Sequence, residues 1–349
     1  MQENSSIKAV ALFSGGLDSV LATRLILEQG IAVTAIHIRT SLSYVDRARM
    51  LGEAPRDQPL PVEIAAETLG VGLEIIDAFE EYLPMVLEPR YGYGSGVNPC
   101  IDCRIFLLRR AKRWMEEHSY HFVFTGEVVG QRPKSQKRPT LRTVERESGL
   151  QGYLLRPLSA KLLDPTIPEE RGWVDRDKLL GISGRGRKAQ IALAKQFGIV
   201  DYAQPSGGCC YLIDKTYARR LRDVIAHGET ALINLAFAQL LAVGRHFRLP
   251  DGTKIIVGRD ERENDFIDHY NGNGLWLRAA ECVGPTGLVV GASSPDGLSL
   301  AAQIVAGYGR GSAESEVLVE LRFASGLVAP AQLLRVAPLS REDIHVLMV

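Results

Sequence analysis

Residues 8–19 read KAVALFSGGLDS, and this stretch decides the fold of the first half of the chain. Its apolar run predicts a short strand over 8–13 that ends at a Ser-Gly-Gly turn. The amphipathic residues 18–29 predict a helix after the turn, and the apolar residues 32–38 predict a second strand. Strand, helix and strand in this order form a β-α-β unit, in which the two strands lie parallel.

Further cycles of helix and strand follow this first unit. They are helices over 61–69 and 105–118 and strands over 72–78 and 121–126. Repeated alternation predicts an α/β fold with a doubly wound parallel sheet, whose ligand sites lie at the carboxyl ends of the strands. The polar stretches 41–60 and 130–151 break the alternation and are predicted to be loops.

After about residue 235 the pattern changes to short strands separated by turn signals. The strands are predicted over 246–250, 254–260, 275–281, 287–292 and 316–323, with one helix near 297–308. This pattern favours a smaller α+β domain. The sequence therefore predicts three parts: the α/β domain over 1–160, a mainly helical segment carrying the late cysteines over 161–235, and the α+β domain over 236–349.

The composition is that of an ordinary globular protein. Of 349 residues, 46% are hydrophobic and 23% are charged, which excludes global disorder, collagen and coiled coil. No run approaches 18 consecutive apolar residues, and residues 1–8 lack the basic and apolar regions of a signal peptide. We therefore expect a cytoplasmic protein that does not insert into membranes.

Charge is distributed unevenly along the chain. Basic and acidic residues balance at 41 each, but residues 1–100 carry a net charge of −6, residues 101–200 carry +9 and residues 231–349 carry −3. The basic middle third favours a surface that meets polyanionic phosphate. Solvated helix faces rich in Lys and Arg would give the same count.

The glycine turn after the first strand is a candidate anion site. Backbone N–H groups and the positive end of the following helix face whatever lies at the tip of the strand. Gly15 and Gly16 let the backbone approach an anion closely, and the hydroxyls of Ser14 and Ser19 can donate hydrogen bonds to it. The turn lacks the Lys of a Walker A loop, which argues against γ-phosphate transfer. The alternative is a tight turn with an ordinary helix cap.

The cysteines form a second constellation. Cys100 and Cys103 make a C-x-x-C motif, whereas Cys209 and Cys210 are adjacent and lie more than a hundred residues later. Four interpretations are open: a zinc site, although adjacent thiolates seldom close a tetrahedral site; three thiolates holding a [4Fe–4S] cluster with one open iron; persulfide and disulfide chemistry without a metal; or inert structural thiols. Cys282, on a predicted strand, is interpreted as a core residue.

The hexapeptide of residues 14–19 resembles SGGxDS, the signature of the PP-loop ATP pyrophosphatases. The resemblance implies that ATP is cleaved between its α and β phosphates and that a substrate oxygen becomes adenylylated. It implies nucleotide contacts from Ser14, Gly15, Gly16, Asp18 and Ser19. Asp18 would also help to hold Mg²⁺, which offsets charge on the leaving group.

The segments NPCIDCR (98–104) and PSGGCCYL (205–212) resemble the tRNA-specific 2-thiouridylases. In that family the cysteine pair corresponds to Cys103 and Cys210, with Cys209 as the alternative register. Cys100 stands where those enzymes typically have Asp, and it gives the chain a likeness to the C-x-x-C tRNA thiolases that use an iron–sulfur cluster. The resemblance implies Asp18, Cys100, Cys103 and Cys210 as catalytic residues, the three cysteines also being ligands of a [4Fe–4S] cluster.

Other residues support the same interpretation. Gly126 occupies the second glycine turn of PP-loop enzymes, His37 ends a strand as ATP-lining residues of the superfamily do, and Arg132 can contact ATP or RNA phosphates. An ordinary strand turn, a core histidine and a surface cation are the structural alternatives for these three positions. Candidates for the RNA backbone are Arg185, Arg187 and Lys188.

The segment FRLPDGTKIIVGRDERENDFI (247–267) resembles the RNA-binding domain of NFACT proteins. The motif positions are held here by Gly258, Arg259, Asn264 and Asp265. The resemblance implies contact with tRNA or another RNA. The alternative is a dimerisation domain, which would make the protein a homodimer.

The leading hypothesis is an ATP-dependent sulfurtransferase that acts on a nucleobase, most plausibly uridine in tRNA. ATP would adenylylate the base carbonyl oxygen, and sulfur from a donor protein or from sulfide, presented by the cysteines, would replace it. The alternatives are a PP-loop synthetase or amidase acting on a small molecule, a nucleobase desulfurase with a [4Fe–4S] cluster, and a non-catalytic ATP- or RNA-binding protein.

Overall fold

The computed structural model describes residues 7–55, 57–200, 202, 209–270, 272–323 and 331–349. These residues form two compact units. The first unit lies within 1–41 and 57–209, and the second lies within 42–56 and 210–349. The two units are defined by contacts between residues, which do not show which segments fold independently. The domain boundaries predicted from the sequence at 160 and 235 therefore stay a prediction.

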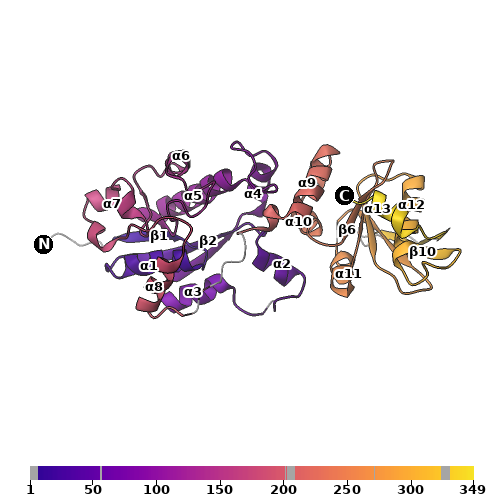
Figure 1. The fold of residues 1–349 in the computed structure, drawn as a ribbon, viewed down its shortest axis with the longest axis horizontal. Helices are drawn as coiled ribbons and strands as arrows, with labels where there is room; N and C mark the ends of the chain where they lie inside the picture. Colours follow the sequence, from indigo (N-terminus) through magenta and orange to yellow (C-terminus); the bar gives the residue numbers. More distant parts are fainter. Residues whose placement is uncertain (1–6, 56, 201, 203–208, 271, 324–330) are drawn as a thin grey trace. The chain divides into compact units, whose positions relative to one another are not determined.

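A five-stranded parallel sheet forms the centre of the first unit (Figure 1). Its strands are β1 (Lys8–Leu12), β2 (Ala32–Arg39), β3 (Gly72–Asp77), β4 (Phe122–Thr125) and β5 (Leu154–Leu155). They lie in the order β3-β2-β1-β4-β5. The strand order reverses between β1 and β4, and ligands of such sheets bind at the carboxyl ends of the strands beside this reversal.

Helices cover both faces of this sheet. Alternate side chains of β1 enter different cores, Ala9 and Ala11 on one face and Val10 and Leu12 on the other. Against the first face pack α1 (Leu17–Leu27), α3 (Pro61–Leu69) and α8 (Lys188–Gln196). Against the second pack α5 (Cys100–Glu117) and α6 (Arg138–Ser148). The unit also contains α4 (Phe79–Leu87) and α7 (Ile167–Glu170). The predicted doubly wound α/β fold is confirmed.

Two stretches that the sequence predicted to be loops contain helices. Within 130–151, α6 buries Leu141 and Val144, which lie one turn apart on an otherwise polar helix. Within 41–60, α2 (Tyr44–Met50) begins after Ser43, whose hydroxyl oxygen accepts a hydrogen bond from the Asp46 backbone N–H at 3.1 Å. Both predictions were wrong because a narrow buried stripe or a capping residue suffices to place a helix in a polar sequence.

The second unit contains a six-stranded antiparallel sheet. Its strands are β6 (Arg245–Arg248), β7 (Lys254–Val257), β8 (Gly274–Ala279), β9 (Gly287–Val290), β10 (Val317–Phe323) and β11 (Gln332–Val336), in the order β11-β10-β8-β9-β7-β6. The apolar side of α12 (Pro295–Tyr308) packs on this sheet to form its core. The other α-helices described in this unit are α2, α9 (Lys215–Ala226), α10 (Leu235–Leu240), α11 (Glu261–Asp268) and α13 (Arg341–Val346). The predicted α+β class of this region is confirmed.

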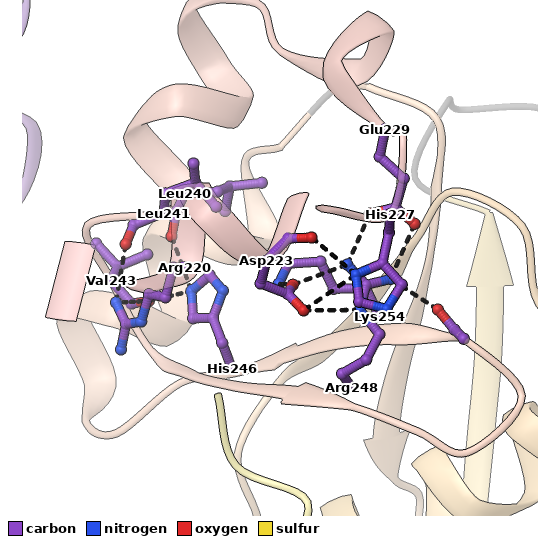
Figure 2. Close-up of polar contacts among 11 residues, drawn as sticks. Arg220, Asp223, His227, Glu229, Leu240, Leu241, Val243, His246, Arg248 and Lys254 are labelled. Carbon is purple, nitrogen blue, oxygen red and sulfur yellow. Dashed lines mark hydrogen bonds and ion pairs between the residues drawn. The ribbon is translucent and has the colours of Figure 1, made fainter. Parts of the chain in front are cut away.

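A buried ionic cluster joins α9 to strands β6 and β7 (Figure 2). The carboxylate of Asp223 accepts hydrogen bonds from Lys254 at 2.6 Å and from Arg248 at 2.8 Å. Arg248 also bonds Glu229 at 2.7 Å. The Lys254 side chain is fully buried, so its charge depends on Asp223 for compensation.

His246 of β6 belongs to a second set of polar contacts, next to this ionic cluster (Figure 2). Its Nε2 contacts the carbonyl oxygens of Val243 at 2.8 Å and Leu240 at 3.2 Å, and its Nδ1 has no hydrogen-bond partner among the described residues. Burial holds the pKa of His246 well below its usual value, and the nearby Arg220 and Lys254 charges lower it further. The ring is therefore neutral at pH 7.

Among the residues that the structure describes, no helix has the length and apolar character needed to span a membrane.

Candidate active site

The glycine turn lies at the carboxyl end of the central strand β1 and leads directly into α1. Gly15 has a φ of +71°, and a Cβ atom at this position would lie 2.8 Å from the Cα of Val62, so only glycine fits. Gly16 begins the helix without a side-chain cap. The hydroxyl oxygens of Ser14 and Ser19 are 3.2 Å apart beside it. The turn thus offers two hydroxyls and helix N–H groups to an anion.

Gly126 follows β4 and presses on the start of α1. A Cβ atom at Gly126 would lie 2.4 Å from the carbonyl carbon of Asp18 and 2.5 Å from the backbone nitrogen of Ser19. The glycine is therefore required for packing between β4 and the helix start. Its predicted contact with a nucleotide stays a prediction.

The carboxylate of Asp18 faces a loop and a helix that come from much later in the chain. Its Oδ2 accepts a hydrogen bond from Gln131 Nε2 at 2.7 Å and lies 3.4 Å from the Arg187 guanidinium. Gln190 in turn donates to Gln131 Oε1 at 3.3 Å. Asp18 Oδ1 is buried and has no hydrogen-bond partner among the described residues. An unsatisfied buried carboxylate oxygen fits a ligand of Mg²⁺, the cation that the resemblance implies at this position.

His37 and Arg132 flank this region in different ways. His37, near the end of β2, contacts the carbonyl oxygen of Phe13 through Nδ1 at 3.0 Å. This bond holds the imidazole beside the residue that precedes the glycine turn. The backbone N–H of Arg132 donates to Gln136 Oε1 at 3.0 Å, which fixes the loop that also carries Gln131.

Cys100 is the first residue of α5, and Cys103 follows three residues later, on the same side of the helix. Burial raises the pKa of Cys103 to about 12; the Cys209 charge raises it further, while a hydrogen bond with Tyr82 acts in the opposite direction. Burial likewise raises the pKa of Cys100, with a further increase from Cys209 and an opposing effect of Arg132. Both groups are therefore protonated thiols at neutral pH. These electrostatic effects also place Cys209 near both of them.

Cys209 and Cys210 have different surroundings, although they are adjacent. Cys209 is exposed, and its sulfur forms a hydrogen bond with Arg132. Cys210 is buried in the second unit, where its charge acts on Tyr211 and Tyr217. The structure therefore groups Cys209 with the C-x-x-C motif. The resemblance implies Cys210 with Cys209 as the alternative, and which of the two thiols takes part in the reaction stays a prediction.

Glu127 is the centre of a buried ion cluster behind the C-x-x-C motif. Its carboxylate lies 3.2 Å from Arg104 and 3.1 Å from Arg156, and both Glu127 and the Arg156 side chain are almost fully buried. Burial acts to raise the pKa of Glu127, but the two guanidiniums hold it below its usual value. Glu127 therefore forms ion pairs with Arg104 and Arg156 inside the protein.

The chemistry of the thiols bears on the implied [4Fe–4S] cluster. Among the described residues, no three His, Cys, Asp or Glu side chains are arranged to hold a metal ion. Besides Cys209, the charges that act on the Cys100 thiol are those of the cations Arg132, Arg104 and Lys134. The residues present do not fit the cluster, so no step is derived through it.

Two separate regions of the chain match known protein families. Residues 7–169 match the family described as tRNA methyl transferase HUP domain, and residues 244–348 match the family described as NFACT protein RNA binding domain. The first region is thus similar to PP-loop HUP domains and the second to NFACT RNA-binding domains, and these regions are called the HUP domain and the NFACT domain below. The HUP domain holds the glycine turn, Cys100 and Cys103, and the NFACT domain holds the six-stranded sheet.

The HUP domain is similar to curated tRNA-specific 2-thiouridylases. The chain is 35% identical over 124 residues to MnmA of Syntrophotalea carbinolica, covering 32% of this chain and 33% of the relative. It is 24% identical over 251 residues to MnmA of Frankia alni, covering 71% of this chain and 66% of the relative. The chain thus spans about a third of the length of the first relatives. A 4-thiouridine synthetase–RNA complex with bound ATP matches 55% of the chain and 41% of that structure at 21% identity, with a TM-score of 0.36.

Three residues of the site were missed from the sequence. Gln131, Gln190 and Tyr82 contact Asp18, Gln131 and Cys103 respectively. No local pattern marks them, because each acts through a contact over 20 residues or more of chain. Arg187, which is predicted to contact the RNA backbone, lies 3.4 Å from Asp18 and adds a cation beside the glycine turn. Its contact with RNA stays a prediction. Residues 203–208, which precede the late cysteine pair, lie outside the described residues.

Proposed function

We propose that the protein is an ATP-dependent sulfurtransferase that exchanges a carbonyl oxygen for sulfur on a nucleobase, with uridine in tRNA as substrate. The observation that supports it most directly is the position of two consecutive residues. Gln131 bonds Asp18 of the glycine turn, and Arg132 bonds the sulfur of Cys209. Because adjacent Cα atoms are about 3.8 Å apart, one short loop connects the ATP site to the thiols.

The first step uses the glycine turn. The base carbonyl oxygen attacks the α-phosphorus of ATP, and the bond to the β-phosphate oxygen breaks, so that pyrophosphate leaves. Ser14, Ser19 and the N–H groups of the α1 start hold the departing pyrophosphate. Arg187 adds a positive charge beside it. Mg²⁺, held by Asp18, would neutralise further charge on these phosphates.

The second step uses the thiols. A persulfide on Cys209, formed from a sulfur donor protein or from sulfide with an oxidant, attacks the activated base carbon, and AMP leaves with the former carbonyl oxygen. Cys103 or Cys100 then loses its proton and attacks the inner sulfur of Cys209. The S–S bond breaks, the outer sulfur stays on the base, and a protein disulfide forms. A reductant must supply two electrons to restore the dithiol.

The positions of the cysteines fit these roles. Cys209 is exposed and bonded to Arg132, so its sulfur is accessible and lies beside a cation. Cys100 and Cys103 have raised pKa values, so both are protonated before the step in which one of them loses its proton and attacks the inner sulfur of Cys209. The cytoplasm, which supplies tRNA and reductant, is the proposed location.

The test is RNA-dependent formation of AMP. Purified protein is incubated with radiolabelled ATP, Mg²⁺, unmodified tRNA and inorganic polysulfide, which forms the persulfide on Cys209 without a further oxidant, and the products are separated. We expect AMP and pyrophosphate in equal amounts only when tRNA is present, and no AMP from Asp18→Asn. Absence of AMP with every RNA would favour a non-catalytic ATP- or RNA-binding protein. AMP formed without RNA would favour a synthetase acting on a small molecule.

A further inference from the structure

An open pocket in the NFACT domain gathers positive charge. It has a volume of about 650 Å³ and is lined by Arg245, Arg259, Arg310, Arg341 and Tyr308. Residues 231–349 contain ten Lys and Arg residues and carry a net charge of −3. Four of these ten basic residues line one pocket, so the local charge is opposite in sign to that of the whole segment.

Two of the guanidiniums share one aromatic ring. The Arg245 guanidinium lies 4.7 Å and the Arg341 guanidinium 4.1 Å from the centroid of the Tyr308 ring. The ring orients both cations through cation–π attraction without neutralising either charge. Two like charges held close together are stabilised when an anion binds between or beside them.

Most of these arginines lack a carboxylate partner. In the described part of the domain, Arg245, Arg310 and Arg341 form no ion pair, whereas Arg259 is paired with Glu263. Arg248 of the same sheet, by contrast, is bonded to both Asp223 and Glu229. The charge of Arg248 is therefore neutralised within the protein. Arg245, Arg310 and Arg341 are available to an external anion.

The backbone also leaves room for a ligand. Gly258, Gly284 and Gly309 line the pocket, so parts of its wall are bare backbone. A Cβ atom at Gly258 would lie 2.1 Å from Asn264 Oδ1, an atom that also accepts the Thr286 N–H at 3.0 Å. This contact fixes the loop that carries Arg259. The pocket walls are thus set by packing before any ligand arrives.

We propose that this arginine pocket binds phosphodiester groups of the RNA backbone. Guanidinium groups bind phosphate oxygens through paired, charge-assisted hydrogen bonds, and arginine is more suited to this than lysine. The acidic residues of the lining, Asp260 and Glu261, are outnumbered by the arginines, and Asp260 is already occupied in capping α11. The inference rests on the proposed function, because an RNA substrate supplies the phosphodiester.

The experiment is a binding titration with the full chain. Fluorescently labelled unfractionated tRNA is titrated with wild type, with the double variant Arg310→Ala/Arg341→Ala and with Arg335→Ala, and anisotropy is recorded at several salt concentrations. Arg335 is the matched control, since it is an exposed arginine on β11 whose nearest acid, Glu316, is 4.0 Å away. Thermal unfolding of each variant verifies that it is folded.

We expect the double variant to bind tRNA about tenfold or more weakly, with a salt slope reduced by about two, because two phosphate contacts are lost. The Arg335→Ala variant should bind within about twofold of wild type. Arg310→Lys/Arg341→Lys should recover part of the affinity, since charge is kept but paired hydrogen bonding is lost. Such recovery also shows that the loss does not arise from misfolding.

Two results would overturn the proposal: unchanged tRNA binding by the double variant, or an equal loss of tRNA binding in Arg335→Ala. The proposed function is tested separately by AMP formation. If the wild type forms AMP with tRNA while the double variant binds normally, only the pocket is wrong. If binding depends on the pocket but no AMP forms, only the sulfur transfer is wrong.

Discussion

Replacing Gly15 or Gly16 of the glycine turn by alanine tests whether the turn has the backbone conformation that the structure shows. Gly15→Ala places a Cβ atom 2.8 Å from the Val62 Cα and requires a side chain at a φ of +71°. The left-handed conformation costs about 1 kcal/mol, and the contact costs about 1–3 kcal/mol because backbone of α3 must shift. We therefore expect a loss of about 2–4 kcal/mol in the free energy of unfolding of the first unit.

Gly16→Ala is the matched control in the same turn. Gly16 has a φ of −80°, and its added Cβ atom would meet only the Ser14 hydroxyl, at 3.5 Å. We expect its unfolding free energy to stay within about 0.5 kcal/mol of wild type. Thermal and urea unfolding are followed by circular dichroism. Equal stability of the two variants would refute the assigned backbone conformation.

Three further predictions concern other parts of the chain. Asp223→Ala should lower the unfolding free energy of the second unit by about 3–5 kcal/mol in urea titrations, because Lys254 stays buried without its carboxylate; a loss under 1 kcal/mol would show that the cluster is not compensating charge. Because burial lowers the folded-state pKa of His246, the unfolded state binds more protons than the folded state below about pH 6.5. The free energy of unfolding should therefore fall with decreasing pH by up to about 1.4 kcal/mol per pH unit until the folded-state pKa is reached. His246→Asn should remove this pH dependence, and an identical pH profile in wild type and variant would contradict the prediction. Cys209→Ser should abolish thiolation of tRNA and the release of AMP while leaving ATP- and RNA-dependent release of pyrophosphate, because the base is still adenylylated. Cys210→Ser should retain thiolation; the reverse pattern would assign the reaction to Cys210.

The first half of the fold could be predicted because its signals are local. Strand β1, the glycine turn and α1 are consecutive in sequence, and the alternating helices and strands determine a parallel sheet. The edge strand β11 was not predicted because most of its side chains are exposed, so it has no apolar period. Helix α6 was missed for a related reason, since only a narrow stripe of the helix is buried.

The candidate site was only partly predictable, because its contacts join distant segments. Ser14 to Ser19 were found from one hexapeptide, and Cys100 and Cys103 from another short motif. The partners of Asp18, by contrast, lie 113 and 169 residues away in sequence. The third cysteine could not be assigned from sequence, since adjacent residues share the same flanking pattern and only the fold separates their surroundings.

The most direct test of sulfur transfer is the nucleoside content of tRNA in the source organism. Total tRNA from a strain lacking the gene is digested and analysed by mass spectrometry beside the parent and strains complemented with wild type or Asp18→Asn. The account predicts that one thionucleoside disappears in the deletion, returns with wild type and stays absent with Asp18→Asn. A thionucleoside profile identical in the deletion strain and the parent would contradict it.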